Sequence, residues 1–259
     1  NIWNEFKYKI KTPKKFFNEI QYENRNPSYV KVLGLLKDIS TNPERNLLKG
    51  TKLYRARIVS DKKKLNKYPN YFGYDAEESF VPPAKVTKGM RANYRYIPYL
   101  YCASDPYISL VEVRPRLSAD VSIATIVANE DLILLDFTIK TKPKKMTSPK
   151  ENLFSDLSKL YSAPIADEDD TFDYIPTQYI AEYTKNLGYD GIAFTSSLTP
   201  EDRESSIDRY NIVVFNYWKC SVIKSNIVSV SRNYLDCEQT DDDTEQLKIK
   251  WNTYCNSNP

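Results

Sequence analysis

A small set of cations, one aromatic ring, one hydroxyl and one carboxylate stands near the ends of the segments that the sequence predicts as strands and helices. The set consists of Arg55, Arg57, Arg91, Tyr101, Glu112 and Ser196. Guanidinium groups suit phosphates, an aromatic face suits a planar heterocycle, and a carboxylate stabilises a developing oxocarbenium ion. Together these residue types predict a site that cleaves a dinucleotide at a glycosidic bond.

Glu112 stands out because of its place on a short predicted helix. The helix begins at Pro106, where Asp105 can cap the free N–H groups, and Pro115 prevents its continuation. Glu112 then lies on the last turn, beside the negative end of the helix dipole. A carboxylate at this position does not stabilise the helix, so we interpret Glu112 as a functional residue.

The composition removes several kinds of catalysis. The 259 residues include no histidine, which is the commonest general base and the commonest metal ligand. The four cysteines show no zinc spacing, and the acidic run at 167–170 is expected to be a solvated loop. Ser-His-Asp and Cys-His mechanisms are excluded. An enzyme with this sequence would use carboxylate, Arg, Tyr and hydroxyl groups, without a metal.

Composition also indicates the class of protein. Apolar residues make up 41% and aromatic residues 13% of the chain, which predicts a folded protein, and the net charge is only +3. This balance gives no electrostatic case for a nucleic-acid or membrane partner. No apolar run reaches transmembrane length, no signal-peptide pattern opens the sequence, and the cysteines are scattered. We therefore expect a cytoplasmic protein.

The elements that must position the candidate residues are strands and helices in mixed order. Strands are predicted at 50–57, 97–103, 121–129, 132–137, 189–197, 211–217 and 222–230, and further helices near 153–161 and at 176–188. Residues 58–96 are polar and predicted to be mostly loop. Leu53, Arg55 and Arg57 share one face of the first strand, so the two arginines are either solvated on an edge strand or directed into an anion site.

The sequence divides into a main domain and two flanking segments. Residues 1–49 predict a helical N-terminal extension packed on the main domain, with a separate partner-binding module as the alternative. Residues 50–235 form the predicted catalytic domain, and residues 236–259 form an acidic C-terminal tail. Either flanking segment could also restrain the site in cis.

Six motifs, in order along the chain, resemble those of the RES domain family. They are LYRAR at 53–57, RAN at 91–93, YLYCAS at 99–104, VEVRP at 111–115, PTQYIAE at 176–182 and DGIAFTSS at 190–197. The resemblance extends over roughly residues 50–218. The Arg, Glu and Ser after which the family is named fall here on Arg55 or Arg91, on Glu112 and on Ser196.

The resemblance implies a fold and an activity. The fold is α+β, with ADP-ribosyltransferase-like mixed sheets and flanking helices. Such domains are usually the toxin of a toxin–antitoxin pair and degrade NAD, cleaving the nicotinamide–ribose bond by phosphorolysis or hydrolysis. The alternative within this fold is a mono-ADP-ribosyltransferase that modifies a cellular protein. The resemblance leaves the acceptor open among phosphate, water and a protein side chain.

The resemblance also implies roles for individual residues. Arg55 and Arg91 would hold the pyrophosphate and the nicotinamide-side ribose, with Arg57 as a further NAD-binding cation. Tyr101 would stack on the nicotinamide. The remaining roles concern the reacting centre, where Glu112 would stabilise the oxocarbenium-like state or orient the nucleophile.

Ser196 would hydrogen-bond the substrate or Glu112. No cofactor is implied beyond NAD as the substrate, and no metal.

The implied partners are NAD, inorganic phosphate as one candidate acceptor, and a helix-turn-helix antitoxin that covers the site. A ribonuclease or nucleic-acid-binding toxin is the reading from another class, because lysine runs at 14–15 and 62–64 and the many tyrosines could contact a backbone and bases. The sequence has no histidine and no clustered acid pair for phosphodiester cleavage, so a ribonuclease is disfavoured.

Overall fold

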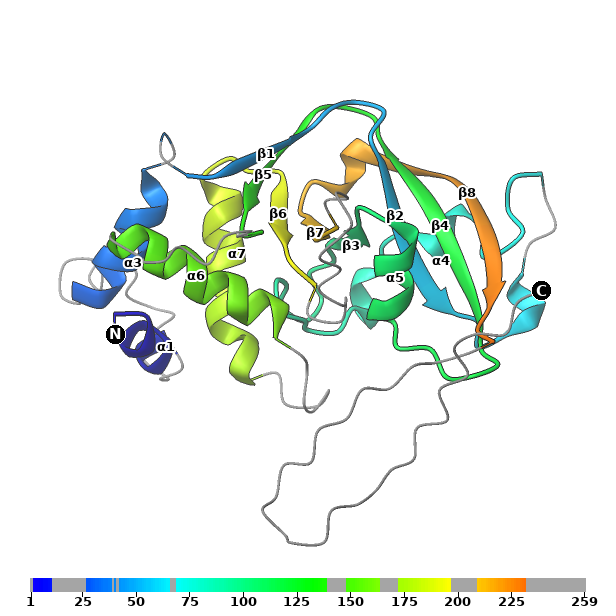
Figure 1. The fold of residues 1–259 in the computed structure, drawn as a ribbon, viewed down its shortest axis with the longest axis horizontal. Coiled ribbons are helices and arrows are strands. Elements are labelled where there is room, and N and C mark those ends of the chain that lie inside the picture. The colour runs from blue at the N-terminus through cyan, green and yellow to red at the C-terminus, as the bar shows by residue number, and fades with distance from the viewer. Residues whose placement is uncertain are drawn as a thin grey trace, which may run out of the picture.

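The computed structural model describes residues 2–10, 27–38, 40, 42–65, 69–138, 148–163, 172–196 and 209–231. Eight strands form one sheet in the order β1-β5-β6-β7-β3-β2-β4-β8, and helices flank it (Figure 1). Strands β5 and β6 pair in parallel, and the other neighbouring strands pair antiparallel. The predicted α+β class, with a mixed sheet and flanking helices, is confirmed.

The strands are β1 (Glu44–Leu47), β2 (Lys52–Ile58), β3 (Leu100–Ala103), β4 (Asp120–Ala128), β5 (Leu132–Asp136), β6 (Gly191–Phe194), β7 (Asn211–Val214) and β8 (Cys220–Ser229). The α-helices are α1 (Ile2–Ile10), α3 (Pro27–Lys37), α4 (Ala76–Ser79), α5 (Pro106–Glu112), α6 (Pro149–Ser162) and α7 (Ile175–Asn186). Short 3-10 turns lie at η2 (Lys62–Lys64), η3 (Ala84–Val86), η4 (Phe172–Tyr174) and η5 (Tyr217–Lys219).

All seven predicted strands and the three predicted helices of the main domain are present, because strong local signals define them. The side chain of Asp105 caps α5 by accepting a hydrogen bond from the Tyr107 backbone at 2.8 Å, and Pro106 is the first helical residue. Helix α6 begins with a reciprocal capping box between Ser148 and Glu151.

The expectation of helices alone in residues 1–49 was incomplete. Helices α1 and α3 are present, but β1 follows them and extends the sheet by pairing with β5. Leu47 is the one apolar residue of the four in β1, so the sequence of this strand shows no apolar alternation that could reveal it. The acidic tail predicted at 236–259 lies outside the described residues, and the domain boundaries stay predictions.

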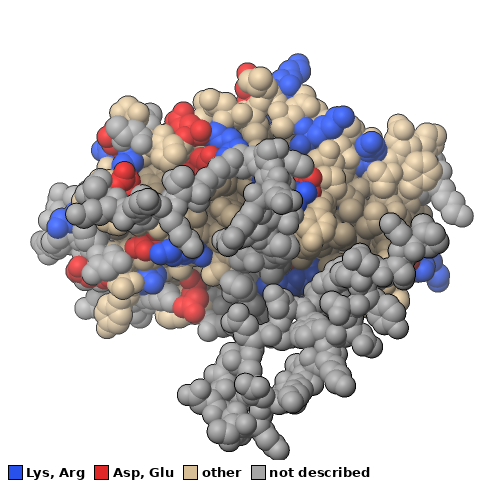
Figure 2. All heavy atoms as spheres, in the orientation of Figure 1, with Lys and Arg blue, Asp and Glu red and all other residues tan. Residues whose placement is uncertain are grey.

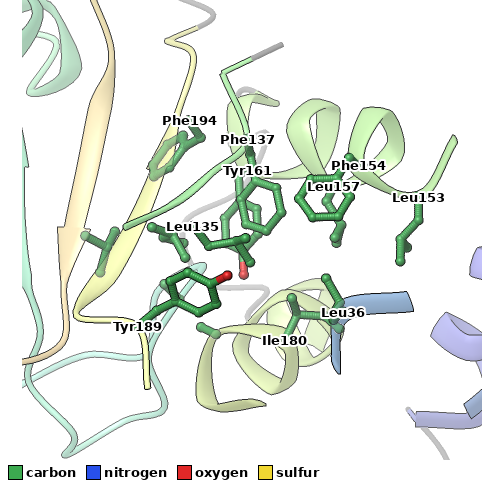
Figure 3. Close-up of a cluster of buried hydrophobic side chains, with 14 of the residues drawn as sticks. Leu36, Leu135, Phe137, Leu153, Phe154, Leu157, Tyr161, Ile180, Tyr189 and Phe194 are labelled. Atoms are coloured by element: carbon green, nitrogen blue, oxygen red, sulfur yellow. The ribbon is translucent and has the colours of Figure 1, made fainter. Parts of the chain in front are cut away.

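The two faces of the sheet carry separate hydrophobic clusters. Helices α1, α3, α6 and α7 contribute to the larger cluster, together with side chains from β5, β6 and β7. Figure 3 shows this cluster, in which the Tyr161 ring of α6 stacks on Phe137 with ring centroids 5.3 Å apart. The second cluster includes Leu53, Leu100 and Cys102, and Phe80 packs against it.

A single residue pair joins two parts of the sheet. Strands β2 and β3 pair only at Tyr54 and Ala103, whereas β2 pairs with β4 from Lys52 to Ile58. We call β1, β5, β6, β7 and β3 the five-stranded half, and β2, β4 and β8 the three-stranded half. Helix α5 follows β3 directly and packs against β2, β3 and β4, so it spans the junction (Figure 1).

Asp190 anchors the start of β6 with a set of short contacts. Its carboxylate accepts hydrogen bonds from the Ile133 backbone at 3.0 Å and from Asn216 Nδ2 at 2.8 Å, and it forms an ion pair with Lys219 at 2.9 Å. Burial alone would raise the pKa of Asp190, but the bonds from Asn216, Ile133 and Lys219 outweigh it and lower the pKa below its ordinary value.

This lowered pKa predicts an acid-labile contribution to stability. The unfolded chain protonates Asp190 at a higher pH than the folded chain does, so the stabilisation is present at neutral pH and is lost as the pH falls through the lowered pKa. We expect Asp190→Asn to lower the free energy of unfolding at pH 7 by about 1–3 kcal/mol. Urea unfolding between about pH 2 and pH 7 measures both effects. If the unfolding free energies of the native chain and of Asp190→Asn change in parallel with pH, Asp190 does not make this acid-labile contribution.

Candidate active site

Glu112, the last residue of α5, carries an exposed carboxylate that two buried groups hold. Its Oε1 accepts hydrogen bonds from Ser196 Oγ at 2.5 Å and from Asn211 Nδ2 at 2.6 Å. Ser196 is 5% exposed and Asn211 is 7% exposed. The site therefore presents a charged group to solvent while its orientation is set from inside the protein.

Three neighbouring strands of the five-stranded half bring these residues together. Ser196 follows the end of β6, and Asn211 is the first residue of β7. Asn211 pairs with Phe194 of β6 on one side and with Ala103 of β3 on the other. Because α5 starts just after β3, the carboxylate at its end reaches the two donors at the same edge of the sheet.

The two carboxylate oxygens of Glu112 differ in their hydrogen bonding. Both donors bind Oε1, and within the described part of the chain Oε2 has no hydrogen-bond partner. Hydrogen bonds to a carboxylate are short and strong because they are charge-assisted. Oε2 therefore keeps its lone pairs for a positively charged carbon or for the hydrogen of a nucleophile.

Tyr101 lies on the same face of the sheet as Asn211. Ala103, opposite Asn211, is two residues from Tyr101, and alternate residues of a strand share a face. The Tyr101 hydroxyl donates to Asn93 Oδ1 at 2.8 Å and accepts from the Ala92 backbone at 3.1 Å. Burial raises the pKa of Tyr101 well above its ordinary value, so the hydroxyl is a neutral group that holds the 91–93 loop.

The loop that carries Arg91 is fixed by two further side chains. Gln178 Nε2 of α7 donates to the carbonyls of Met90 at 2.8 Å and Asn93 at 3.0 Å. Asn93 Nδ2 in turn donates to three carbonyls of the same loop. The guanidinium of Arg91 donates to the Tyr161 carbonyl. The PTQYIAE motif, which lies on α7, thus supports the loop that contains the RAN motif.

Arg55 and Arg57 project from the opposite face of the sheet. Tyr54 shares the face of Ala103, its partner across the junction, so the next residue, Arg55, faces the other way. The Arg55 guanidinium donates to the Phe80 carbonyl, and Arg57 donates to the Glu78 carbonyl. The structure therefore brings Ser196 to Glu112, with Asn211, but it does not bring the two β2 arginines to that carboxylate.

Arg55 is nevertheless an unusual cation. Burial, and next the nearby charge of Arg57, lower its pKa to about 10. Among the described residues no carboxylate pairs with Arg55, whereas Arg57 has the Glu78 carboxylate at 3.6 Å. A partly buried guanidinium without a counter-ion is costly, and a bound anion would compensate for it.

Sequence reasoning missed two residues of this region, Asn211 and Gln178, as candidates. A polar residue at the head of the buried apolar strand β7 is the one available signal for Asn211, because all four β7 residues are buried. Gln178 lies within a motif that the resemblance used, but its role as a donor to loop carbonyls depends on how α7 packs.

No group of three potential metal ligands occurs among the described residues. None of the helices that the structure describes has the length and apolar character needed to span a bilayer. On the described surface that Figure 2 shows, basic and acidic side chains lie interspersed.

Comparisons with known proteins place the chain in a family. Residues 53–232 match the RES domain. No curated protein matches the chain. Among solved structures, a chain in the crystal structure of the M. tuberculosis MbcT–MbcA toxin–antitoxin complex is similar, with 14% identity and a TM-score of 0.43, over 78% of this chain and 93% of that chain. Because the family match spans well over half of its residues, this protein belongs to the RES domain family.

Proposed function

We propose that this protein is an NAD-degrading toxin enzyme that cleaves the bond between nicotinamide and ribose. The observation that carries the proposal is the Glu112 carboxylate, with Oε1 fixed by two buried donors and Oε2 left for the substrate. Membership of the RES domain family supports NAD as the substrate and a toxin–antitoxin context.

The chemistry matches a chain without histidine. Nicotinamide is a cationic leaving group, so the C1′–N bond breaks with its electron pair moving to the ring nitrogen, and no strong general acid is required. Glu112 would stabilise the resulting positive charge at C1′ and orient the incoming oxygen. Water would give ADP-ribose, and inorganic phosphate would give its 1-phosphate ester. In each case the nucleophile loses one proton to solvent.

The remaining groups are proposed as substrate ligands. Arg91, near Tyr101, would bind one anionic part of NAD, and the Tyr101 ring would stack on nicotinamide. Arg55 projects from the face of the sheet opposite Glu112, so an NAD molecule that contacts both must lie across the junction between the two halves. Arg55 stays a proposed pyrophosphate ligand because it is a partly buried cation without a carboxylate partner in the described chain. Arg57 is proposed only as a supporting charge, because Glu78 already lies near it.

The proposed biological setting follows from the family. A toxin of this type requires neutralisation, and we propose a helix-turn-helix antitoxin as the partner and the cytoplasm as the compartment. Because Glu112 is exposed, a protein bound over the end of α5 would block substrate access without altering the fold.

The exposure of Glu112 also favours a second candidate, a mono-ADP-ribosyltransferase. A macromolecular acceptor reaches an exposed carboxylate more readily than a buried one. In that case the side chain of a target protein, and not water or phosphate, would take the ADP-ribose. Transfer of label from NAD to protein distinguishes this activity from release of free ADP-ribose.

The experiment that tests the proposal is incubation of the purified chain with NAD, in phosphate buffer and in phosphate-free buffer. Chromatography follows nicotinamide and the ADP-ribose product. We expect nicotinamide release, and its dependence on phosphate separates a phosphorylase from a glycohydrolase. Intact NAD in both buffers, together with no labelled protein in a cell extract, would overturn the proposal.

A further inference from the structure

We infer that Asn211 is a positioning residue that holds Glu112 with Oε2 directed toward the substrate. The inference rests on the proposed function in one respect, namely that Glu112 is the catalytic carboxylate. It assigns a role to a residue outside the six candidates that the sequence indicated. Asn211 Nδ2 donates a 2.6 Å hydrogen bond to Oε1, and strand pairing on both sides fixes the backbone of Asn211.

Asn211 is held more firmly than the group it binds. Its backbone pairs with β3 and with β6, and its side chain is buried. Glu112, in contrast, is exposed at the end of a seven-residue helix, where its three side-chain torsions are free unless something anchors the carboxylate. Asn211, which the sheet fixes, therefore determines the orientation of the Glu112 carboxylate.

The amide of Asn211 also has a chemical advantage over the Ser196 hydroxyl. A hydroxyl rotates and acts as donor or acceptor, whereas the amide nitrogen of Asn211 can only donate. An obligate donor at 2.6 Å from Oε1 keeps that oxygen occupied in every rotamer of Ser196. The second oxygen, Oε2, is thereby the one left for the reacting centre.

The kinetic test replaces Asn211 in two ways. Asn211→Ala removes the donor, and we expect kcat to fall roughly 100-fold with little change in KM, because misplacing a catalytic group by about 1 Å costs this much. Asn211→Asp keeps the shape but places a second carboxylate beside Glu112, and we expect a larger loss. A change in KM with unaltered kcat would overturn the positioning role.

Asn216 provides a matched control. Its Nδ2 donates to a carboxylate oxygen of Asp190 at 2.8 Å, and it lies two residues beyond the end of the same strand, away from Glu112. Asn216→Ala therefore removes the same kind of bond from the same region. We expect it to lower the thermal midpoint while kcat is unchanged, which separates loss of stability from loss of positioning.

A spectroscopic measurement tests the inference without the reaction. Three-bond couplings about the side-chain torsions of Glu112 should report one rotamer in the native chain and in Asn216→Ala, and averaged rotamers in Asn211→Ala. A single rotamer in Asn211→Ala would overturn the inference, whatever the activity. If the native chain releases no nicotinamide but the couplings change as expected, the proposed function fails and the positioning role stands.

Discussion

Replacing Glu112 with Gln is expected to lower NAD cleavage by at least about 100- to 1000-fold without unfolding the protein. Removal of one preorganised electrostatic contact with a transition state typically has this effect. Gln has the same shape as Glu, and its carbonyl oxygen can still accept from Ser196 and Asn211. What it lacks is the negative charge opposite the forming oxocarbenium ion.

The matched control for this prediction is Glu77→Gln. Glu77 is also an exposed glutamate on a short helix, α4, and it lies outside the site. We expect both variants to keep the native thermal midpoint, because neither carboxylate is buried. Steady-state nicotinamide release from both proteins decides the matter. Near-normal turnover by a folded Glu112→Gln protein would refute the catalytic role of this carboxylate.

Replacing Arg55 with Met is expected to weaken NAD binding and to stabilise the free protein. Burial lowers the pKa of Arg55 to about 10, so folding disfavours its charged form at every pH below that value. Met removes this charge at the cost of one hydrogen bond to the Phe80 carbonyl. We expect a gain of about 1–3 kcal/mol in unfolding free energy and a loss of roughly tenfold or more in NAD affinity.

Calorimetric titration with NAD and thermal unfolding measure the two effects on the same sample. Arg57→Met is the comparison, because its side chain is 39% exposed and lies near the Glu78 carboxylate, so its removal should change stability little. If Arg55→Met instead lowers the thermal midpoint and binds NAD normally, Arg55 serves to hold the segment that contains Phe80, and the anion site lies elsewhere.

The parts of the fold that the sequence could predict are those with local signals. Helix α5 follows from Asp105, Pro106 and Pro115, all within a few residues of it. The main strands follow from their apolar runs and from the turns that separate them. The proximity of Glu112 to Ser196 came from the resemblance to the RES domain, since no spacing rule joins residues so far apart in sequence.

The parts that could not be predicted depend on strand register between distant segments. The face of the sheet on which Arg55 lies relative to Glu112 is set by the Tyr54–Ala103 pair, which no local pattern encodes. The same holds for Asn211, whose role depends on β7 lying between β6 and β3. Strand β1 was missed because its partner, β5, is about ninety residues away.

The positions of these strands along the chain determine when, during synthesis, the candidate active site can form. The two donors to Glu112 follow it in the chain by 84 and 99 positions. Ribosomes add about 5–20 residues per second, so a growing chain carries Glu112 for roughly 5–20 s before both donors have been made. During that interval β3 lacks its β7 neighbour and β4 lacks β8, which leaves open strand edges. An unfinished chain is thus exposed to aggregation before it can possess the proposed activity.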